Sequence, residues 1–244
     1  MKKFLPLSYS SLKQFAISPS HFLAYKKRTF KSTPSMTLGT AVHTLVLEPE
    51  TFEDRYYVMP DDIRRGTNAF KEHEALAASR GDEVEILKKK DLIPIRAMRD
   101  NILDHPKASF LLSRCHTFEQ RRAWKFNGLD FHGFVDAEGD DCIVDLKTTQ
   151  DASIKKFSRS VVDFKYYWQA ALYCAATGYS KRFFVIAVEN TAPFNVAVYE
   201  IGKEFIDVAI AQIVDATNDF KKWDGMPMSY SKDVEMLTPP SWML

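Results

Sequence analysis

The amino-acid sequence predicts an α/β fold in which a central mixed β-sheet is flanked by helices. Three observations lead to this prediction. Apolar residues recur at helical spacing through much of the first hundred residues. From Phe118 onward they alternate as they do in half-buried strands. A helix-spaced segment over Phe164–Ala176 then interrupts the strands, which is typical of an α/β arrangement.

The first part of the chain is expected to be mainly helical. Ser8 or Ser10 is a suitable N-cap for a short helix, and Pro19 suits the first turn of a second one. Further helices are expected over 36–47, 71–79 and 91–103. The stretch 52–88 is the most polar of the chain, so it is expected to leave the core as an excursion.

The second part is expected to form the sheet. Asn127-Gly128 is a strong signal for a tight hairpin, and Gly178 suits the end of the interrupting helix. Strands are predicted over 118–126, 129–135, 142–147, 183–188 and 196–201, with a long amphipathic helix over 204–223. The apolar, proline-bearing tail 237–244 is expected to dock on the body or on a neighbouring subunit.

Composition favours one domain over residues 1–244, with 45% hydrophobic and 27% charged residues. This domain is expected to consist of a mainly helical part (1–117), the sheet with its helix (118–201), and a final helix with the tail (202–244). No apolar run approaches the roughly 20 residues needed to span a bilayer, and the basic start lacks a signal-peptide core. A cytoplasmic location is therefore expected. Three scattered cysteines argue against a disulfide scaffold, a zinc knuckle and an iron–sulfur cluster.

Asp145-Leu146-Lys147 is the most informative stretch. Residues two apart in a strand share a face, so Asp145 and Lys147 are expected on one face, about 7 Å apart. Asp136 ends the preceding strand, and its carboxylate can converge with that of Asp145 on one ion. With the Leu146 carbonyl and waters, this set suits Mg²⁺ or Mn²⁺. Lys147 would orient the attacking water or stabilise the phosphate. The alternative is a salt-bridged strand end.

Other residues favour a catalytic interpretation. His43 follows Gly39, which permits close backbone approach, on the polar side of a helix. Glu119 lies at the start of the first sheet strand, where another carboxylate could reach a metal. Gln169 and Tyr173 are four apart and share a helix face. Individually, such a histidine is more often structural, and such a pair is often an ordinary helix flank.

In this order the residues resemble the motifs of the PD-(D/E)xK nuclease superfamily, in its RecB-like branch. The four motifs are Gly39 to His43, Gly133 to Asp136, Asp145 to Lys147, and Gln169 to Tyr173. Nearly the whole chain is most similar to the RecE-type exodeoxyribonuclease VIII domains of phages and prophages. The superfamily's Pro-Asp dipeptide is Val135-Asp136 here, a common departure.

The resemblance implies a restriction-endonuclease-like core and a role for each motif residue. His43, Asp136, Asp145 and the Leu146 carbonyl would bind the metal, Lys147 would be the catalytic lysine, and Gln169 and Tyr173 would lie near the DNA backbone. Glu119 is a further candidate catalytic residue whose role varies between families. Arg64-Arg65 and Lys26-Lys27-Arg28 are candidates for gripping phosphate.

The resemblance also implies a Mg²⁺-dependent exodeoxyribonuclease, for which Mn²⁺ could substitute. Such an enzyme digests linear duplex DNA from the 5′ end and leaves 3′ overhangs for phage-type recombination. RecE-type enzymes form rings, so a trimer or tetramer is expected, with a single-strand annealing recombinase as partner. The alternatives are a RecB- or Cas4-like nuclease of other polarity, an endonuclease, and a catalytically inactive DNA-binding member. Cas4-like proteins usually carry four cluster-binding cysteines, which this chain lacks.

Overall fold

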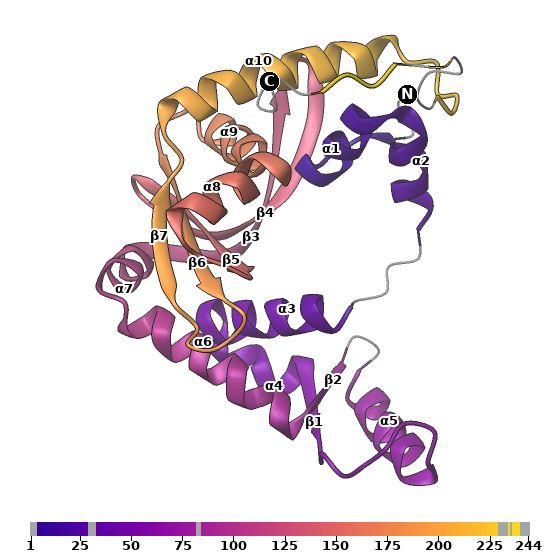
Figure 1. The fold of residues 1–244 in the computed structure, drawn as a ribbon, viewed down its shortest axis with the longest axis vertical. Helices are drawn as coiled ribbons and strands as arrows, with labels where there is room; N and C mark the ends of the chain where they lie inside the picture. The colour runs from indigo at the N-terminus through magenta and orange to yellow at the C-terminus, as the bar shows by residue number, and fades with distance from the viewer. Residues whose placement is uncertain (1–3, 29–32, 82–83, 229–233, 235, 240–244) are drawn as a thin grey trace.

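A five-stranded mixed sheet forms the centre of the protein (Figure 1). The computed structural model describes residues 4–28, 33–81, 84–228, 234 and 236–239. The strands, in spatial order, are β3 (Cys115–Phe126), β4 (Leu129–Gly139), β5 (Cys142–Thr149), β6 (Arg182–Glu189) and β7 (Val196–Glu200). Only the β5–β6 pair of this sheet is parallel, and its other neighbours are antiparallel. The predicted mixed sheet is therefore confirmed.

Helices cover both faces of the sheet and bury two separate apolar clusters. The first face carries α1 (Tyr9–Ile17), α2 (Pro19–Lys27), α8 (Ile154–Asp163), α9 (Tyr166–Ala176) and α10 (Lys203–Lys222). The second face carries α3 (Pro34–Leu47), α6 (Leu92–Asp104) and α7 (Pro106–Ser113). Among the helices of the described part of the chain, none is long and apolar enough to cross a membrane.

Local sequence signals place several of these elements. Ser8 caps α1 and forms a reciprocal capping box with Ser11. Ser18 caps α2, and Pro19 occupies its first turn. The turn between β3 and β4 has positive φ at Asn127 and Gly128, as its sequence predicts. The predictions for Ser8, Pro19 and the Asn127-Gly128 turn are therefore confirmed, whereas the Ser18 cap was not predicted.

The polar excursion is more structured than expected. It contains α4 (Phe52–Arg55), β1 (Tyr56–Met59), α5 (Asn68–Arg80) and β2 (Glu85–Lys88), and it is flanked by η2 (Pro49–Thr51) and η3 (Lys89–Asp91). The strands β1 and β2 pair in parallel as a small second sheet. Tyr56 and Leu87 of these strands join the second apolar cluster, so part of the excursion belongs to the core. Parallel pairing between segments so far apart leaves no local signal in the sequence.

Other segments differ from the sequence-based expectations. Neither α7 nor α8 was predicted as a separate helix, and α9 begins at Tyr166, two residues later than expected. Of the tail, Leu237 lies within the described residues and is 97% exposed, so it does not dock on the body. The last five tail residues, 240–244, lie outside the described residues.

The strands β4 and β5 pair over a short length and then separate. Their register includes only Ala137 with Val144 and Glu138 with Ile143. Nearer the start of β4, the N-terminal segment pairs with the edge of this strand. There the Leu7 N–H donates to the Asp130 carbonyl at 2.9 Å. The divergence opens the sheet between two strands that both carry candidate catalytic carboxylates.

Candidate active site

Asp136 and Asp145 lie where β4 and β5 separate. The Leu146 N–H donates to Asp136 Oδ2 at 2.8 Å, so a side chain takes the place of the missing ladder hydrogen bond. In an extended strand the N–H and carbonyl of one residue point to the same side. The Leu146 carbonyl therefore faces the same gap between the strands.

Three side chains meet at this gap. One ligand atom each from His43, Glu119 and Asp136 lies within 4.8 Å of the others. His43 Nδ1 is 3.5 Å from Asp136 Oδ2 and 3.9 Å from Glu119 Oε1. All three residues are partly exposed, so the group is open to solvent. The structure thus brings together three residues that the sequence singled out from a helix and two strands.

Helix α3 carries His43 to the sheet through a close contact. A Cβ added at Gly39 would lie 3.1 Å from Thr148 Oγ1 on β5, closer than most real Cβ contacts. Only glycine fits this approach without displacing the threonine. The expected role of Gly39 in close packing agrees with this geometry.

An irregularity in the sheet turns the carboxylates toward the histidine. Glu119 has φ of 46°, a left-handed conformation that is uncommon for a residue with a side chain. On the neighbouring strand, Val135 packs into the first apolar cluster and Ala137 into the second. Residues two apart share a face in a regular strand, so β4 turns at Asp136. Glu119 also lies within β3 and not at its start, since the strand begins at Cys115.

Asp145 and Lys147 form an ion pair beside this group. Lys147 Nζ is 2.6 Å from Asp145 Oδ2, which confirms that both side chains lie on one face. Asp145 is 2% exposed and Lys147 is 19% exposed. Gln169 Nε2 donates to the other oxygen, Asp145 Oδ1, at 2.7 Å. Asp145 is outside the group of three, so convergence of Asp136 and Asp145 on one ion stays a prediction.

Burial dominates the electrostatics of Asp145. It raises the pKa of that carboxyl to about 6, with Asp136 acting in the same direction, although Lys147 favours ionisation. The pKa of Lys147 is raised because its carboxylate neighbours outweigh the effect of burial. Burial alone would lower the pKa of His43, but Asp136 and Glu119 overcome it and raise that pKa. The site therefore retains both signs of charge.

Gln169 and Tyr173 support the site from inside the protein. The resemblance places them near the DNA backbone, but both side chains are buried. Tyr173 Oη donates to the Phe134 carbonyl at 2.7 Å. A Cβ added at Gly133 would lie 2.7 Å from the Tyr173 ring and hydroxyl. Helix α9 thus contacts β4 through Gly133 and β5 through Asp145.

Several neighbours of Lys147 were not predicted as site residues. Lys147 Nζ lies 5.2 Å from the centre of the Tyr166 ring. Tyr9 Oη donates to the Phe164 carbonyl, and burial raises the pKa of Tyr9. Lys13, one turn later on α1, contacts the same carbonyl at 3.3 Å. Tyr9 is part of a stretch that the resemblance covers, but no sequence pattern singled out Lys13.

The donor chemistry fits a divalent metal. Two carboxylates and one imidazole nitrogen are a set that Mn²⁺ and Mg²⁺ sites can use, with the carboxylates suiting Mg²⁺ best. Asp145 Oδ2 is also buried without a hydrogen bond of good geometry, despite its short distance from Lys147. Such an oxygen has acceptor capacity left for a cation.

The predicted phosphate-gripping residues lie elsewhere. Arg64 and Arg65 are exposed in the loop between β1 and α5, which Figure 1 shows beyond α3 from the sheet. Lys26 and Lys27 end α2, and Arg28 follows them. Arg28 lies over the Tyr25 ring at 4.4 Å. The role of these residues in DNA binding stays a prediction.

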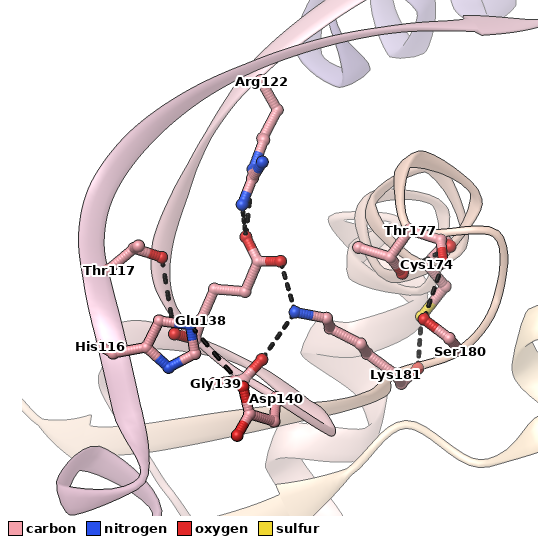
Figure 2. A network of polar contacts seen from close by, with 10 residues as sticks. All are labelled: His116, Thr117, Arg122, Glu138, Gly139, Asp140, Cys174, Thr177, Ser180 and Lys181. Carbon is pink, nitrogen blue, oxygen red and sulfur yellow. Dashed lines mark hydrogen bonds and ion pairs between the residues drawn. The ribbon is translucent and has the colours of Figure 1, made fainter.

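A separate ionic network secures the closed end of the β4–β5 pair (Figure 2). The buried carboxylate of Glu138 accepts hydrogen bonds from Arg122 at 2.6 Å and from Lys181 at 2.6 Å. Lys181 also donates to the Gly139 carbonyl at 2.6 Å. Burial opposes ionisation of Glu138, but these hydrogen bonds outweigh it and lower its pKa. The network thus links β4, two residues from Asp136, to β3 through Arg122 and to the residue before β6 through Lys181.

The fold and site define the class of protein. A mixed sheet whose diverging strands present Asp136 and the Asp145–Lys147 pair has the arrangement of a PDDEXK-like domain. The chain belongs to the family described as PDDEXK-like domain of unknown function (DUF3799), whose profile matches residues 8–225. No curated protein matches the sequence.

Solved structures agree on the fold. A protein from Eubacterium rectale, described as a "putative exonuclease", is similar with a TM-score of 0.63 and 13% identity, over 88% of this chain and 80% of that one. This confirms the predicted restriction-endonuclease-like fold. The structure of SSO0001 matches with a TM-score of 0.33 and 17% identity, over 81% of this chain and 90% of that one, which is too low to support a conclusion. The family and the fold support a nuclease.

Proposed function

We propose that this protein is a metal-dependent deoxyribonuclease that hydrolyses phosphodiester bonds. The observation that supports it most is the open group of His43, Glu119 and Asp136 beside the buried Asp145–Lys147 pair. A structural ion pair would have no need of three further ligand-type side chains, one of them in a left-handed backbone conformation.

Each residue has a definite part in this proposal. His43, Glu119 and Asp136 would hold the ion, and Asp145 would add an oxygen from the adjoining strand. When bound, such an ion supplies an acidic water and neutralises charge on the phosphate. Lys147, whose ammonium is partly exposed, would place a positive charge beside the scissile phosphate.

Gln169 would act as a positioning residue. Its hydrogen bond holds one oxygen of Asp145, which leaves the other oxygen directed at Lys147. Because Asp145 is buried, this restraint fixes the carboxylate before substrate arrives. The geometry therefore keeps both charges of the pair in place without help from DNA.

The test compares purified wild type with Lys147→Met on linear 5′-phosphorylated duplex, single strands and closed circles. Each substrate is incubated with MgCl₂, MnCl₂ or EDTA. Lys203→Met is the matched control, since Lys203 is exposed and pairs with Asp207 on α10. We expect metal-dependent digestion by wild type and the control, and its loss in Lys147→Met. Full activity of Lys147→Met would refute the proposed role of the lysine, and no digestion by wild type would refute the nuclease assignment.

The finer proposal is a 5′-to-3′ exonuclease on linear duplex DNA that leaves 3′ overhangs for phage-type recombination. It is supported by the resemblance to RecE-type domains and by the description of the E. rectale protein. A ring-shaped oligomer and a single-strand annealing partner belong to the same proposal. Duplexes labelled at the 5′ or 3′ end decide the polarity, and sedimentation decides the subunit number. Cutting of closed circles would replace the exonuclease with an endonuclease.

A further inference from the structure

Lys13 lies beside the proposed catalytic centre and forms no ion pair with an acidic residue of the described chain. Its Nζ contacts two oxygens, the Phe164 carbonyl at 3.3 Å and Tyr9 Oη at 3.4 Å. Neither oxygen carries a formal charge at neutral pH. In the described part of the chain, none of the salt bridges includes Lys13, whereas the exposed Lys125 and Lys203 each pair with a carboxylate.

The charged side chains that act most strongly on Lys13 are cations. Burial lowers the pKa of Lys13, and Lys147 and Lys165 lower it further by repulsion. Lys165 has no carboxylate partner among the described residues either, and lies over the Trp168 ring at 4.7 Å. Positive charge gathered in this way next to a hydrolytic site is complementary to a phosphate.

An exposed aromatic ring adjoins these lysines. Phe164, whose carbonyl Lys13 contacts, is 51% exposed at the turn between α8 and α9. Its ring centre is 5.6 Å from that of Tyr166, and Tyr166 in turn lies under Lys147 Nζ at 5.2 Å. Tyr166 therefore lies between Lys147 and the exposed ring of Phe164 and contacts both. Each of these two distances is comparable to one or two times the spacing of about 3.4 Å between successive nucleotides of a DNA strand.

We propose that Lys13 and Phe164 bind the DNA strand next to the bond that is cut. Lys13 holds a phosphate of that strand, and Phe164 stacks on an unpaired base. Aromatic rings beside cations are the usual surface for single-stranded nucleic acid, because every base has a face that can stack. This inference rests on the proposed nuclease function and names how the same site grips its substrate.

The experiment measures binding without cleavage. The probe is a duplex with four unpaired nucleotides at one end, including 2-aminopurine, in EDTA and a series of salt concentrations. Lys13→Met keeps the side-chain stem and removes the charge, so the slope of log affinity against log salt should fall by about 0.7 to 0.9. Lys13→Arg should restore the slope. A merely structural role for Lys13 would lower the melting temperature without changing the slope.

Phe164→Ala should give a different result. We expect affinity to fall about 5- to 150-fold, the range for one stacked base, with the salt slope unchanged. The change in 2-aminopurine fluorescence on binding should also disappear. The matched control is Lys107→Met with Phe110→Ala on α7, where Lys107 lies over a phenylalanine that is also 51% exposed. Helix α7 covers the opposite face of the sheet (Figure 1).

The outcomes separate this inference from the proposed function. Wild-type slope in Lys13→Met, or unaltered fluorescence in Phe164→Ala, would overturn the binding surface while Mg²⁺-dependent cleavage could persist. Wild type that neither binds nor cleaves would overturn both proposals. Probes with a 5′-phosphate and a 5′-hydroxyl show which phosphate Lys13 holds. An effect confined to the phosphorylated probe assigns the terminal group, and an equal effect on both assigns an internal one.

Discussion

Gly133→Ala tests how the interior supports the proposed active site. The added Cβ would lie 2.7 Å from the Tyr173 ring, and ordinary contact begins at 3.4 Å. The ring, and the part of α9 that carries it, must therefore move by about 0.7 Å in a closely packed interior. Overpacking of this kind costs about 1–3 kcal/mol of unfolding free energy.

The same movement should reach the catalytic pair. Gln169 lies one turn before Tyr173 on α9, and its hydrogen bond to Asp145 is 2.7 Å long. A comparable shift would stretch that bond to about 3.4 Å, beyond the usual range for N–H···O. We expect activity to fall on the order of 10²-fold, the size of effect that a misplacement near 1 Å produces.

A double-mutant cycle isolates the contact. Tyr173→Leu removes the atoms that a Cβ at Gly133 would meet, whereas Tyr173→Phe leaves the clashing ring carbons in place. Unfolding in guanidinium chloride should show that Gly133→Ala costs little in the leucine background and its full amount in the phenylalanine background. An equal cost in all backgrounds would refute the steric explanation.

Three further predictions concern the metal group, the ionic network and the thiols. Asp136→Asn should weaken Mn²⁺ binding, measured by calorimetry, by at least about 100-fold. Stability should change little, because the amide oxygen can still accept the hydrogen bond from the Leu146 N–H. Unchanged binding would contradict the assignment of Asp136 as a metal ligand. Glu138→Gln should cost about 2 kcal/mol of unfolding free energy at pH 7, since it weakens hydrogen bonds to a buried charge. Because the pKa of Glu138 is lowered in the fold, that difference should shrink as pH falls below about 4.5 through the lowered pKa, and a constant difference down to pH 2 would be inconsistent with it. Burial raises the pKa of Cys115 to about 12 and of Cys174 to about 11, so iodoacetamide at pH 8 should label both at least about 100-fold more slowly in native than in unfolded protein, as peptide mapping can show.

The sequence predicted the sheet and the elements around it well where the signals were local. The hairpin at Asn127-Gly128, the cap at Ser8 and the helix start at Pro19 depend on neighbouring residues, and the structure has all of them. The pairing of β1 with β2 depends on contacts between distant segments, which no local pattern records. Helix α8 was missed although Ile154, Phe157 and Val161 recur at helical spacing in its sequence.

The proposed site shows the same contrast between features that local sequence signals predict and features that depend on tertiary packing. Motif order singled out His43 and Asp136, and Glu119 was a candidate by its expected place in the first sheet strand. The fold brings all three within ligand distance. The motif also identified Gln169, but its orientation toward Asp145 could be seen only in the packed structure. Lys13 belongs to no motif and approaches the site because α1 packs beside the turn that follows α8. Proximity of this kind is a property of tertiary packing.

The attachment of the N-terminal segment to β4 has a mechanical consequence. Leu7 bonds to β4 on both sides of Phe131, through Asp130 and His132, and α1 begins two residues later. The helix that carries Lys13 is thus tethered to the strand that carries Asp136. If the gap between β4 and β5 widens to admit a substrate, α1 should travel with β4. The tether would then preserve the spacing between these two parts of the site during opening, while the spacing to β5 adjusts.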